Sequence, residues 1–584
     1  MHQIAALSIT HLGWPRLLGL WLLLLVPVVF APFMSDDFFH LLMLGETPPL
    51  PHPQDGSLYG LFSFISDNAG QRRLLMDQGV LPWWTGDNFY FRFWRPLAEI
   101  SHRVDFTLAP GQPLLAHLHN LAWFVALASV LRQLYRQQAV QAPVALLAII
   151  IFVLNGSHAP AIAWIANRNA LLAACFAFLA LYQHGRFRQH GNWHDYLLAL
   201  LCLVLALLAG ESSLAIGGFL FAYAVVMDRA GPLRGFAWLL PYAVIVLGWL
   251  LLYRQLGFGA NGSGMHYVDA LAMPGAFVQA VAERLPVYLL AGFTVLPAEL
   301  YPAVQLLVPD LAGVVLLLVL LTLFLASLLC WPLLKADRAS RFFLLGATLS
   351  IVPFCSLANQ DRLLLIPSAG FSYVIASMIW QVSLRGLQPF VAGWRNAALR
   401  KLVALLVLMH LLLAPLYLLA AGLFIHADAR RTVASLQALP AYSMAARHLV
   451  ILKGPMLHSA LLKPVRQLAS LDVPDQVLLL ATPSASLQLE RVDLQHLLIR
   501  RDGGFVQHFE QSFRDLDSRP FAVGDVIETT AMRLEVLAVN ARGQPLELAA
   551  ELHDAPQYYR FLVYQPGHGL VPVDLPAVGG QAAY

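Results

Sequence analysis

The chain has 584 residues, of which 58% are hydrophobic and only 12% are charged, and its formal net charge is +3. An ordinary soluble domain carries about 25% charged residues, so this composition argues against a soluble core and indicates a membrane protein. The small net charge and the lack of a basic run exclude nucleic acid as a partner.

Long hydrophobic runs recur along the chain. A helix needs about 20 apolar residues to cross about 30 Å of hydrocarbon, and residues 17–33, 311–331 and 402–424 form such runs with few or no charges. The first run is longer than the apolar part of a signal peptide, so we expect it to be a first span. We predict an α-helical, polytopic membrane protein with about eleven spans, near residues 17–34, 113–131, 142–158, 164–182, 196–210, 212–227, 236–254, 311–331, 343–358, 364–382 and 402–424.

Basic residues lie between alternate spans. If the N-terminus is cytoplasmic, every short inside loop is basic, including those with Arg188 and Arg338, as the positive-inside rule expects. An odd number of spans then places the tail and the loops 35–112 and 257–310 on the outer side, which is the periplasm in bacteria. A run at 285–295 in the second loop fits a re-entrant or surface-lying helix. We therefore expect a multi-pass protein of the bacterial inner membrane with a periplasmic C-terminal domain.

Two adjacent carboxylates follow the first span. The segment Ser35–His40 contains Asp36 and Asp37. Carboxylates at a membrane exit usually face water, a cation or a partner, because their desolvation is costly. One of them could act as a general base beside a reacting hydroxyl. A solvated helix end is the alternative, and these two residues alone leave both interpretations open.

The same outer loop ends in a basic and aromatic segment. Residues 89–105 combine many aromatic side chains with Arg95, Glu99 and His102. Pro96 favours a helix start, and the apolar face of that helix would consist of Leu97, Ile100 and Val104. The pattern predicts an amphipathic interfacial helix. It could form the wall of a site or only anchor the chain at the membrane surface.

Further polar residues lie at the predicted outer ends of spans: Asn167-Arg168-Asn169, Glu211 and Asn359-Gln360-Asp361-Arg362. Arginine binds phosphate through paired hydrogen bonds and keeps its proton, so Arg168 and Arg362 are candidates for binding a lipid phosphate. Each could instead be a side chain that snorkels to the interface. Their convergence with the aspartate pair on one predicted face favours a site.

Two other groups have expected structural roles. His117 and Asn120 lie one turn apart near the start of the second span and are expected to form hydrogen bonds between helices. The cysteines lie inside apolar runs and are too scattered for a zinc site, so we expect buried core residues at Cys175, Cys202, Cys330 and Cys355.

The tail changes character after about residue 426. Residues 427–470 have a helical pattern, and short apolar runs between Gly, Pro and Asp turns predict strands near 477–480, 494–499, 533–539 and 559–564. We divide the chain into a membrane domain, 1–425, whose outer loop 35–112 carries interfacial helices, and a β-rich domain, 426–584. No catalytic pattern occurs in this second domain, which we interpret as an accessory or acceptor-binding module.

The ordered motifs resemble those of a known family. The acidic pair, Arg95-Pro96-Leu97 and the stretches 167–173 and 361–368 together resemble the GT-C class of polyprenyl-phosphate-sugar-dependent glycosyltransferases, in the branch around protein O-mannosyltransferases and transmembrane proteins with tetratricopeptide tails. The resemblance covers roughly residues 15–425. The chain departs from the family at Asn167, where glycine is usual, and in its β-rich tail.

The resemblance implies an inverting glycosyltransferase that moves a sugar from a polyprenyl-phosphate donor to a hydroxyl of a glycan, lipid or protein acceptor. Its transition state needs a base at the acceptor hydroxyl and positive charge at the departing phosphate. The expected base is Asp36 or Asp37, with Asp36 slightly favoured. We expect Arg95, Arg168 and Arg362 to bind the phosphate, with support from Glu99, His102, Glu211 and Asp361.

We expect no cofactor. Two carboxylates also suit Mg²⁺ or Mn²⁺, but the matching branch resembles metal-independent members, so a metal is not favoured. One rival hypothesis is a transporter or flippase of lipid-linked intermediates, which would have polar residues near the bilayer midplane. Another is a non-catalytic membrane scaffold. The position of the polar motifs at helix ends and in outer loops favours the enzyme.

Overall fold

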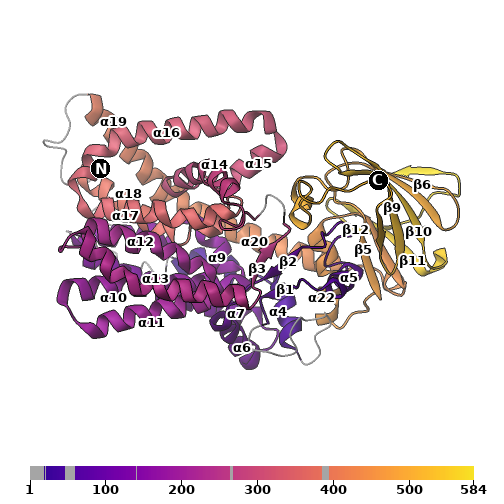
Figure 1. Cartoon of the computed structure of the whole chain (residues 1–584), viewed down its shortest axis with the longest axis horizontal. Helices are drawn as coiled ribbons and strands as arrows, with labels where there is room; N and C mark the ends of the chain where they lie inside the picture. Colours follow the sequence, from indigo (N-terminus) through magenta and orange to yellow (C-terminus); the bar gives the residue numbers. More distant parts are fainter. Residues whose placement is uncertain (1–18, 20, 46–59, 140, 264–266, 384–393) are drawn as a thin grey trace. The chain divides into compact units, whose positions relative to one another are not determined.

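The computed structural model describes residues 19, 21–45, 60–139, 141–263, 267–383 and 394–584. The chain forms two compact units. The first unit comprises Met1–Ala31, Arg95–Leu256 and Val268–Ala427, and the second comprises Pro32–Trp94, Gly257–Tyr267 and Asp428–Tyr584. Figure 1 traces both units along the sequence.

The first unit is helical. Its α-helices are α3 (Val26–Val29), α6 (Pro96–Leu108), α7 (Pro113–Gln138), α8 (Ala142–Val153), α9 (Ala159–Ala163), α10 (Arg168–His190), α11 (Trp193–Ala209), α12 (Ile216–Ala222), α13 (Pro232–Gln255), α14 (Pro274–Phe293), α15 (Leu300–Leu307), α16 (Pro309–Ala336), α17 (Arg338–Ile351), α18 (Pro367–Ser383), α19 (Trp394–Leu408) and α20 (Ala414–Gln437). The helix α20 continues past residue 427 into the part of the sequence assigned to the second unit.

The prediction of a polytopic helical membrane protein is supported in its coarse form. Within the described part of the chain, seven helices are long and apolar enough to cross a membrane, or eight if α8 and α9, bent by 50°, form one span. Two of the other expected spans, 196–210 and 212–227, are shorter apolar helices, Trp193–Ala209 and Glu211–Met227. The expected span 17–34 lies partly outside the described residues. The predicted number of spans is therefore not established.

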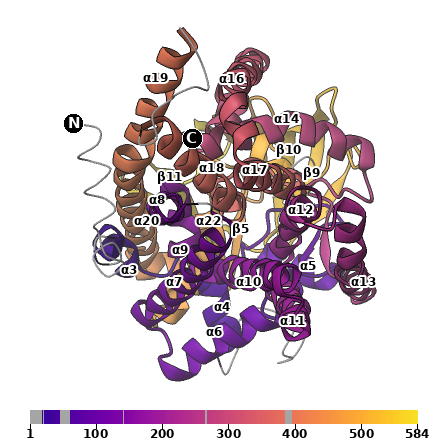
Figure 2. The ribbon, with the colours of Figure 1, turned by 90° about the vertical axis from the view of Figure 1, so that its left-hand side faces the viewer.

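The helices of the first unit differ greatly in how much apolar surface they expose. In the most apolar 18-residue stretch of α16 only 11% of the residues are buried, and in that of α13 only 17%. The corresponding share for the stretch around α10 is 83%. Exposed leucines on long helices would be unfavourable in water and are expected where helices face lipid. Inside the unit, α17 and α18 lie side by side (Figure 2). They approach closely at Gly370, where a Cβ would lie 2.3 Å from the carbonyl oxygen of Phe343.

The helix α14 replaces the shorter helix predicted at 285–295. Its Arg284 donates from Nη1 to the carbonyl oxygen of Cys355 (2.8 Å), and its last residue, Phe293, packs on Phe371 with ring centroids 4.9 Å apart. The chain then turns back, and the backbone N–H of Ala298 reaches Asp361. These contacts place α14 and the turn that follows it beside the loop 355–361, and α14 is itself one of the seven helices long and apolar enough to cross a membrane.

The described residues of the second unit form three sheets. Their strand orders are β1-β2-β3, β13-β6-β7-β10-β9-β8 and β12-β11-β4-β5. The six-stranded sheet is antiparallel, whereas β11, β4 and β5 run parallel. Its elements are α4 (Asp37–Leu44), β1 (Ser63–Ile65), α5 (Ala69–Asp77), β2 (Tyr90–Arg92), β3 (Gly259–Asn261), α21 (Ala441–Met444), β4 (His448–Lys453), α22 (Met456–Leu468), β5 (Gln476–Leu479), β6 (Leu487–Arg491), β7 (His496–Arg501), β8 (Val526–Glu528), β9 (Met532–Val539), β10 (Pro545–Leu552), β11 (Tyr559–Gln565), β12 (Gly569–Val573) and β13 (Gln581–Ala583).

The structure corrects the predicted domain boundary. Residues 32–94 pack with the tail rather than with the membrane helices. The indole N–H groups of Trp83 and Trp84, both fully buried, donate to the carbonyl oxygens of Leu480 (3.0 Å) and Glu510 (3.1 Å). Both indoles donate to carbonyl oxygens of the tail, and Trp83 also packs on Phe505 and Phe521, which explains why this loop belongs to the second unit.

The four predicted strands of the tail are confirmed as β5, β7, β9 and β11. The prediction that 427–470 is helical throughout is wrong at β4, which lies between β11 and β5. Residues 448–452 of this strand are all buried. A central parallel strand reads as a continuous apolar run because both its faces are covered, so its sequence does not distinguish it from a buried helix.

Candidate functional site

The acidic pair after the first predicted span belongs to the second unit. Asp36 is half-buried at the N-cap of α4, and the hydroxyl of Ser35 donates to its Oδ1 (3.3 Å). Asp37 is buried in the first turn, where its Oδ2 accepts the backbone N–H of Met34 (3.0 Å). The positive end of the helix dipole favours carboxylates at this position. Asp36 is the more accessible of the two.

Arg168 begins α10 and is fully buried. It forms an ion pair with Asp105 of α6, and its Nε donates to Oδ1 of Asn120 on α7 (2.5 Å). It also donates to the carbonyl oxygens of Ser101 and Ala116, each at 3.1 Å. A buried guanidinium is tolerated when its charge and donors are matched in this way. Arg168 therefore holds α6, α7 and α10 together.

The carboxylate of Asp105 also orients His119. The Nδ1 atom of His119 lies 2.6 Å from Oδ1 of Asp105, and the indole N–H of Trp123 donates to Nε2 (3.0 Å). An indole nitrogen only donates, so Nε2 accepts from Trp123. Nη1 of Arg168 lies 3.2 Å from Nδ1, so His119 contacts both members of the Arg168–Asp105 ion pair.

Arg95 lies just before α6 and pairs with a carboxylate of the next helical hairpin. Its Nε donates to Oε2 of Glu211 (2.8 Å), and the hydroxyl of Tyr253 donates to Oε1 of the same residue (3.1 Å). A Cβ at Gly210 would lie 3.1 Å from Nδ2 of Asn169 and 3.8 Å from Nε of Arg95. Glycine therefore lets the chain pass closely between these two side chains.

Arg362 is half-buried in the loop before α18. Its Nε donates to Oε1 of Gln360 (2.7 Å), and the guanidinium carbon lies 5.2 Å from the ring centroid of Trp164. A guanidinium above an indole face gains a cation–π interaction and loses rotational freedom. The sequence had indicated Arg362 but not this aromatic neighbour.

Asp361, next to Arg362, is buried, and both oxygens of its carboxylate accept hydrogen bonds. Its Oδ1 accepts the backbone N–H of Ala298 (2.7 Å), and its Oδ2 accepts the hydroxyl of Tyr417 (2.8 Å). Its own backbone N–H donates to Oε1 of Glu299 (2.8 Å). Desolvation by burial raises the pKa of Asp361, and burial together with the neighbouring Asp361 charge raises the pKa of Glu299.

The helix α6 has the predicted amphipathic form, with its apolar side outward. Ile100 and Val104 are exposed, whereas Glu99 and His102 are buried. Arg103 donates to Oε1 of Glu99 from Nη2 (2.7 Å) and from Nε (3.0 Å). An apolar outer face and a polar inner face suit a helix at the membrane interface. Glu99 and His102 therefore point into the unit, as supporting residues would.

Contacts link most of the predicted residues of the first unit at one end of its helices. Nδ2 of Asn120 donates to the carbonyl oxygens of Ile162 (3.0 Å) and Trp164 (3.5 Å). Asn120 also accepts from Arg168, so it connects Arg168 to Trp164, whose ring lies beside Arg362. The expected bond between helices is confirmed for Asn120, because Ile162 lies in α9. His117 Nε2 instead lies 3.0 Å from the carbonyl oxygen of Ala31, which follows α3. All four cysteines are free and buried, also as expected.

The opposite end of the same helices carries a second polar cluster. Arg188, near the end of α10, pairs with Asp228 (2.7 Å), and Nε of Arg338 donates to the carbonyl oxygen of Val226 (2.5 Å). Both arginines lie in loops that the charge pattern predicted to share one side of the membrane. Arg188 follows Arg168 by 20 residues in α10, which corresponds to about 30 Å along the helix at 1.5 Å per residue.

Two site residues were not singled out from the sequence. Asp105 follows Ser101 and His102 at helical spacing, so the inward stripe of α6 was a usable signal. Glu299 carried no such signal because its partner, Asp361, is distant in the sequence. Among the residues that the structure describes, no group of three His, Cys, Asp or Glu side chains is arranged to bind a metal ion.

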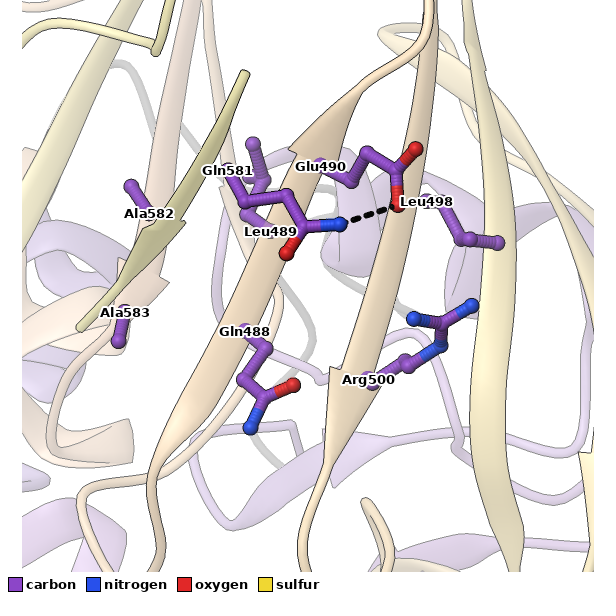
Figure 3. A pocket seen from close by; sticks show the side chains of 8 residues that line it. All are labelled: Gln488, Leu489, Glu490, Leu498, Arg500, Gln581, Ala582 and Ala583. Carbon is purple, nitrogen blue, oxygen red and sulfur yellow. Dashed lines mark hydrogen bonds between the residues drawn. The ribbon is translucent and has the colours of Figure 1, made fainter. Parts of the chain in front are cut away.

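A separate groove of about 260 Å³ lies on the six-stranded sheet of the second unit (Figure 3), lined by Gln488, Leu489, Glu490, Leu498, Arg500, Gln581, Ala582 and Ala583. Nε2 of Gln581 donates to Oε2 of Glu490 (2.9 Å), and Nε of Arg500 donates to Oε1 of Glu547 (2.9 Å). These bonds hold a carboxylate and a guanidinium at the groove. Such a surface can bind a ligand that both donates and accepts hydrogen bonds.

No protein-family model matches the chain, and no curated protein matches it closely enough to be counted as a relative.

Proposed function

We propose that this chain is a membrane glycosyltransferase that moves a sugar from a polyprenyl-phosphate donor to a hydroxyl acceptor at the periplasmic face of a bacterial inner membrane. The observation that carries the proposal is the gathering of Arg95, Arg168 and Arg362 at one end of the helices. The basic loops around Arg188 and Arg338 gather at the other end. By the positive-inside rule that other end is cytoplasmic.

The three arginines receive different roles. Arg362 is half-buried and is oriented by Trp164 and Gln360, so it is the first candidate to bind the donor phosphate. Arg95, held by Glu211, is the second. Arg168 was expected to bind phosphate as well, but its enclosure by protein groups favours a positioning role. It would fix α6 and α7 around the phosphate rather than touch it.

The proposed chemistry needs one base. The Asp36 carboxylate takes the proton of the acceptor hydroxyl as the hydroxyl oxygen forms a bond to the anomeric carbon of the sugar. The bond from that carbon to the phosphate oxygen breaks, and the phosphate leaves with both electrons of the bond. The guanidinium of Arg362 stabilises the growing negative charge. Asp36 is preferred over Asp37 because Asp37 is buried.

The rival hypotheses make different demands. A transporter of lipid-linked intermediates would have charged groups near the middle of its spans. The ion pairs Arg95–Glu211, Arg168–Asp105 and Arg188–Asp228 lie instead at helix ends. A scaffold would need no oriented guanidinium, whereas Arg362 is held by Trp164 and Gln360. The enzyme is therefore favoured over both alternatives.

The activity test uses the full chain in lipid nanodiscs with radiolabelled polyprenyl-phosphate sugar and an envelope extract as the source of acceptor. Asp36→Asn should reduce transfer at least 100-fold, since general-base catalysis contributes about 10²–10⁴. Arg362→Gln should also reduce transfer strongly, whereas Arg254→Gln, at an exposed ion pair, should not. Equal transfer by all variants would reject the assignment. Loss of transfer with EDTA and its recovery with Mn²⁺ would reject the expected metal independence.

Sidedness can be tested separately. The proposal requires positions 36 and 362 to face the same aqueous compartment. The four native cysteines are buried, so Asp36→Cys and Arg362→Cys can each be labelled with a membrane-impermeant thiol reagent from either side. Labelling of the two positions from opposite sides would make the proposed site impossible.

The same proposal assigns the groove of the second unit to the acceptor. Hydroxyl groups can donate to Glu490 and accept from Arg500, so a sugar-bearing acceptor suits this surface. Arg500→Ala should raise the KM for the acceptor while leaving kcat nearly unchanged. Arg533→Ala, at an exposed position of strand β9 in the same sheet but outside the groove, is the matched control. An unchanged KM in Arg500→Ala would remove the groove from the acceptor site.

A further inference from the structure

Ser35, directly before the proposed base Asp36, has a backbone conformation that side chains rarely adopt. Its φ angle is +46°, in the left-handed region where the Cβ atom of an L residue crowds the following carbonyl oxygen. Among the residues that the structure describes, the other positions with positive φ are occupied by glycine, and Ser470 (φ +55°) is the one exception. Ser35 therefore needs an explanation of its own.

Ser470 has an ordinary reason for this conformation, because it follows the C-terminal end of α22. The backbone N–H of Ser470 donates to the carbonyl oxygen of Gln467 (3.0 Å). The backbone N–H of Leu471 donates to that of Arg466 (2.9 Å). A left-handed residue at this place closes the end of many helices. Ser35 precedes α4 instead of following a helix end, so the same reason does not apply to it.

Asp37 closes the turn that contains Ser35. Its backbone N–H donates to the carbonyl oxygen of Met34 (3.0 Å), and its Oδ2 accepts the backbone N–H of Met34 (3.0 Å). When the second residue of a turn has a positive φ, it is usually Gly, Asn or Asp. The two bonds of Asp37 thus hold Ser35 in a conformation that its side chain disfavours.

Buried rings fix the start of α4 beside this turn. Phe38 and Phe39 are buried and belong to the hydrophobic core of the second unit. The ring of Phe33 packs edge-on against that of Phe38, with the centroids 6.3 Å apart. A strained residue persists only where its surroundings determine the local fold. Here the residues on both sides of Ser35 are held in place.

The Ser35 side chain contacts the proposed base. Its hydroxyl donates to Oδ1 of Asp36 (3.3 Å). Asp36 itself has a right-handed backbone, with φ −64° and ψ −15°, so the unusual conformation is confined to Ser35. Glycine would adopt the φ of Ser35 without crowding, but it would offer no side-chain donor to the carboxylate.

We propose that Ser35 is a positioning residue for sugar transfer: its left-handed backbone and its hydroxyl together orient the Asp36 carboxylate toward the acceptor hydroxyl. The inference rests on the proposed function, because it requires Asp36 to be the base. Serine at this position combines a costly backbone conformation with a donor for the carboxylate, which glycine cannot provide. Asp37 then has a separate role, since its carboxylate closes the turn.

The first test measures transfer of radiolabelled sugar by the full chain in nanodiscs. Ser35→Gly keeps the turn and removes the hydroxyl, so kcat should fall about 3- to 10-fold, as expected for one lost hydrogen bond, with an unchanged KM for the donor. A hydrogen-bond donor favours the charged form of a carboxylate, so the acid limb of the pH profile of kcat/KM should move about 0.5–1 pH unit higher. Ser35→Asn tolerates a positive φ and supplies an amide donor, so it should recover most of the rate.

The second test measures thermal unfolding without donor or acceptor. Ser35→Ala lacks the hydroxyl, as Ser35→Gly does, but it keeps the Cβ atom that crowds the backbone. Its transition should therefore lie about 2–4 °C below that of Ser35→Gly. The matched controls are Ser470→Gly and Ser470→Ala. Their transitions should differ in the same direction, and both should transfer sugar like the parent chain.

The outcomes separate this inference from the proposed function. Full transfer by Ser35→Gly with an unchanged pH profile would exclude a role of the hydroxyl and leave the enzyme in place. Equal thermal stability of Ser35→Gly and Ser35→Ala would contradict the backbone strain. A parent chain without transfer, or a fully active Asp36→Asn, would reject the proposed function, and the positioning role of Ser35 would be rejected with it.

Discussion

Replacing Arg168 with methionine tests whether the helices around the candidate site depend on one buried guanidinium. Methionine retains much of the volume of arginine but removes the ion pair with Asp105 and the hydrogen bonds to Asn120, Ser101 and Ala116. Removing one partner of a buried ion pair costs about 3–5 kcal/mol. The Asp105 side chain is 13% exposed, and water there will offset part of the loss, so we expect about 3 kcal/mol.

The assay is equilibrium unfolding of the full chain in mixed micelles by titration with SDS, followed by tryptophan fluorescence. Arg254→Met is the matched control, because Arg254 pairs with Asp269 at 3.3 Å while the side chains remain 52% and 33% exposed. Exposed pairs contribute about 0–1 kcal/mol. If Arg168→Met lost no more stability than Arg254→Met, the buried network would not hold the helices together. Asp105→Leu in the Arg168→Met background should recover part of the loss, since an apolar pair leaves no buried charge.

Two further predictions concern the second unit. Asp77 accepts the backbone N–H (2.9 Å) and the hydroxyl (2.6 Å) of Thr530. Asp77→Ala should therefore destabilise this unit by about 1.5–3 kcal/mol, measured as faster amide exchange in β9. The control Asp87→Ala should have no such effect, because the Asp87 side chain is 82% exposed. The hydrogen bond from His448 holds the pKa of Asp554 below its ordinary value, so the stabilisation by this pair is complete above a pH of about 4 and is lost as the pH falls through the lowered pKa. Asp554→Asn should therefore flatten the acid side of the stability profile between pH 2 and pH 5, and an unchanged slope would contradict this account.

Hydropathy predicted the helical part of the fold because lipid imposes a simple requirement on each span. Runs such as 113–131 and 311–331 correspond to α7 and α16. The same criterion missed the 50° bend between α8 and α9, and it found only the last part of α14, which begins at Pro274. A bend depends on contacts with other helices, and the first half of α14 carries polar residues that lower its hydropathy.

The residues of the candidate site were predictable by type but not by partnership. Arginine at a helix end suggested phosphate for Arg168, yet its burial follows from Asp105 and Asn120, which lie in other helices. Phosphate binding by Arg362 stays a proposal, and the indole of Trp164 orients its guanidinium. Charge pairing between distant segments is decided by tertiary packing, so a single sequence gave the candidates without their neighbours.

The second unit is assembled from three separated stretches of the chain, and this has a consequence for biogenesis. The stretch 32–94 is synthesised first, but the partners of Trp83 and Trp84 are Leu480 and Glu510, about four hundred residues later. Strand β2 likewise can pair with β3 only after residues 259–261 have been synthesised. The segment 32–94 therefore stays incompletely folded, with both indoles exposed, until the C-terminal stretch has been synthesised. During this time it is accessible to chaperones and proteases.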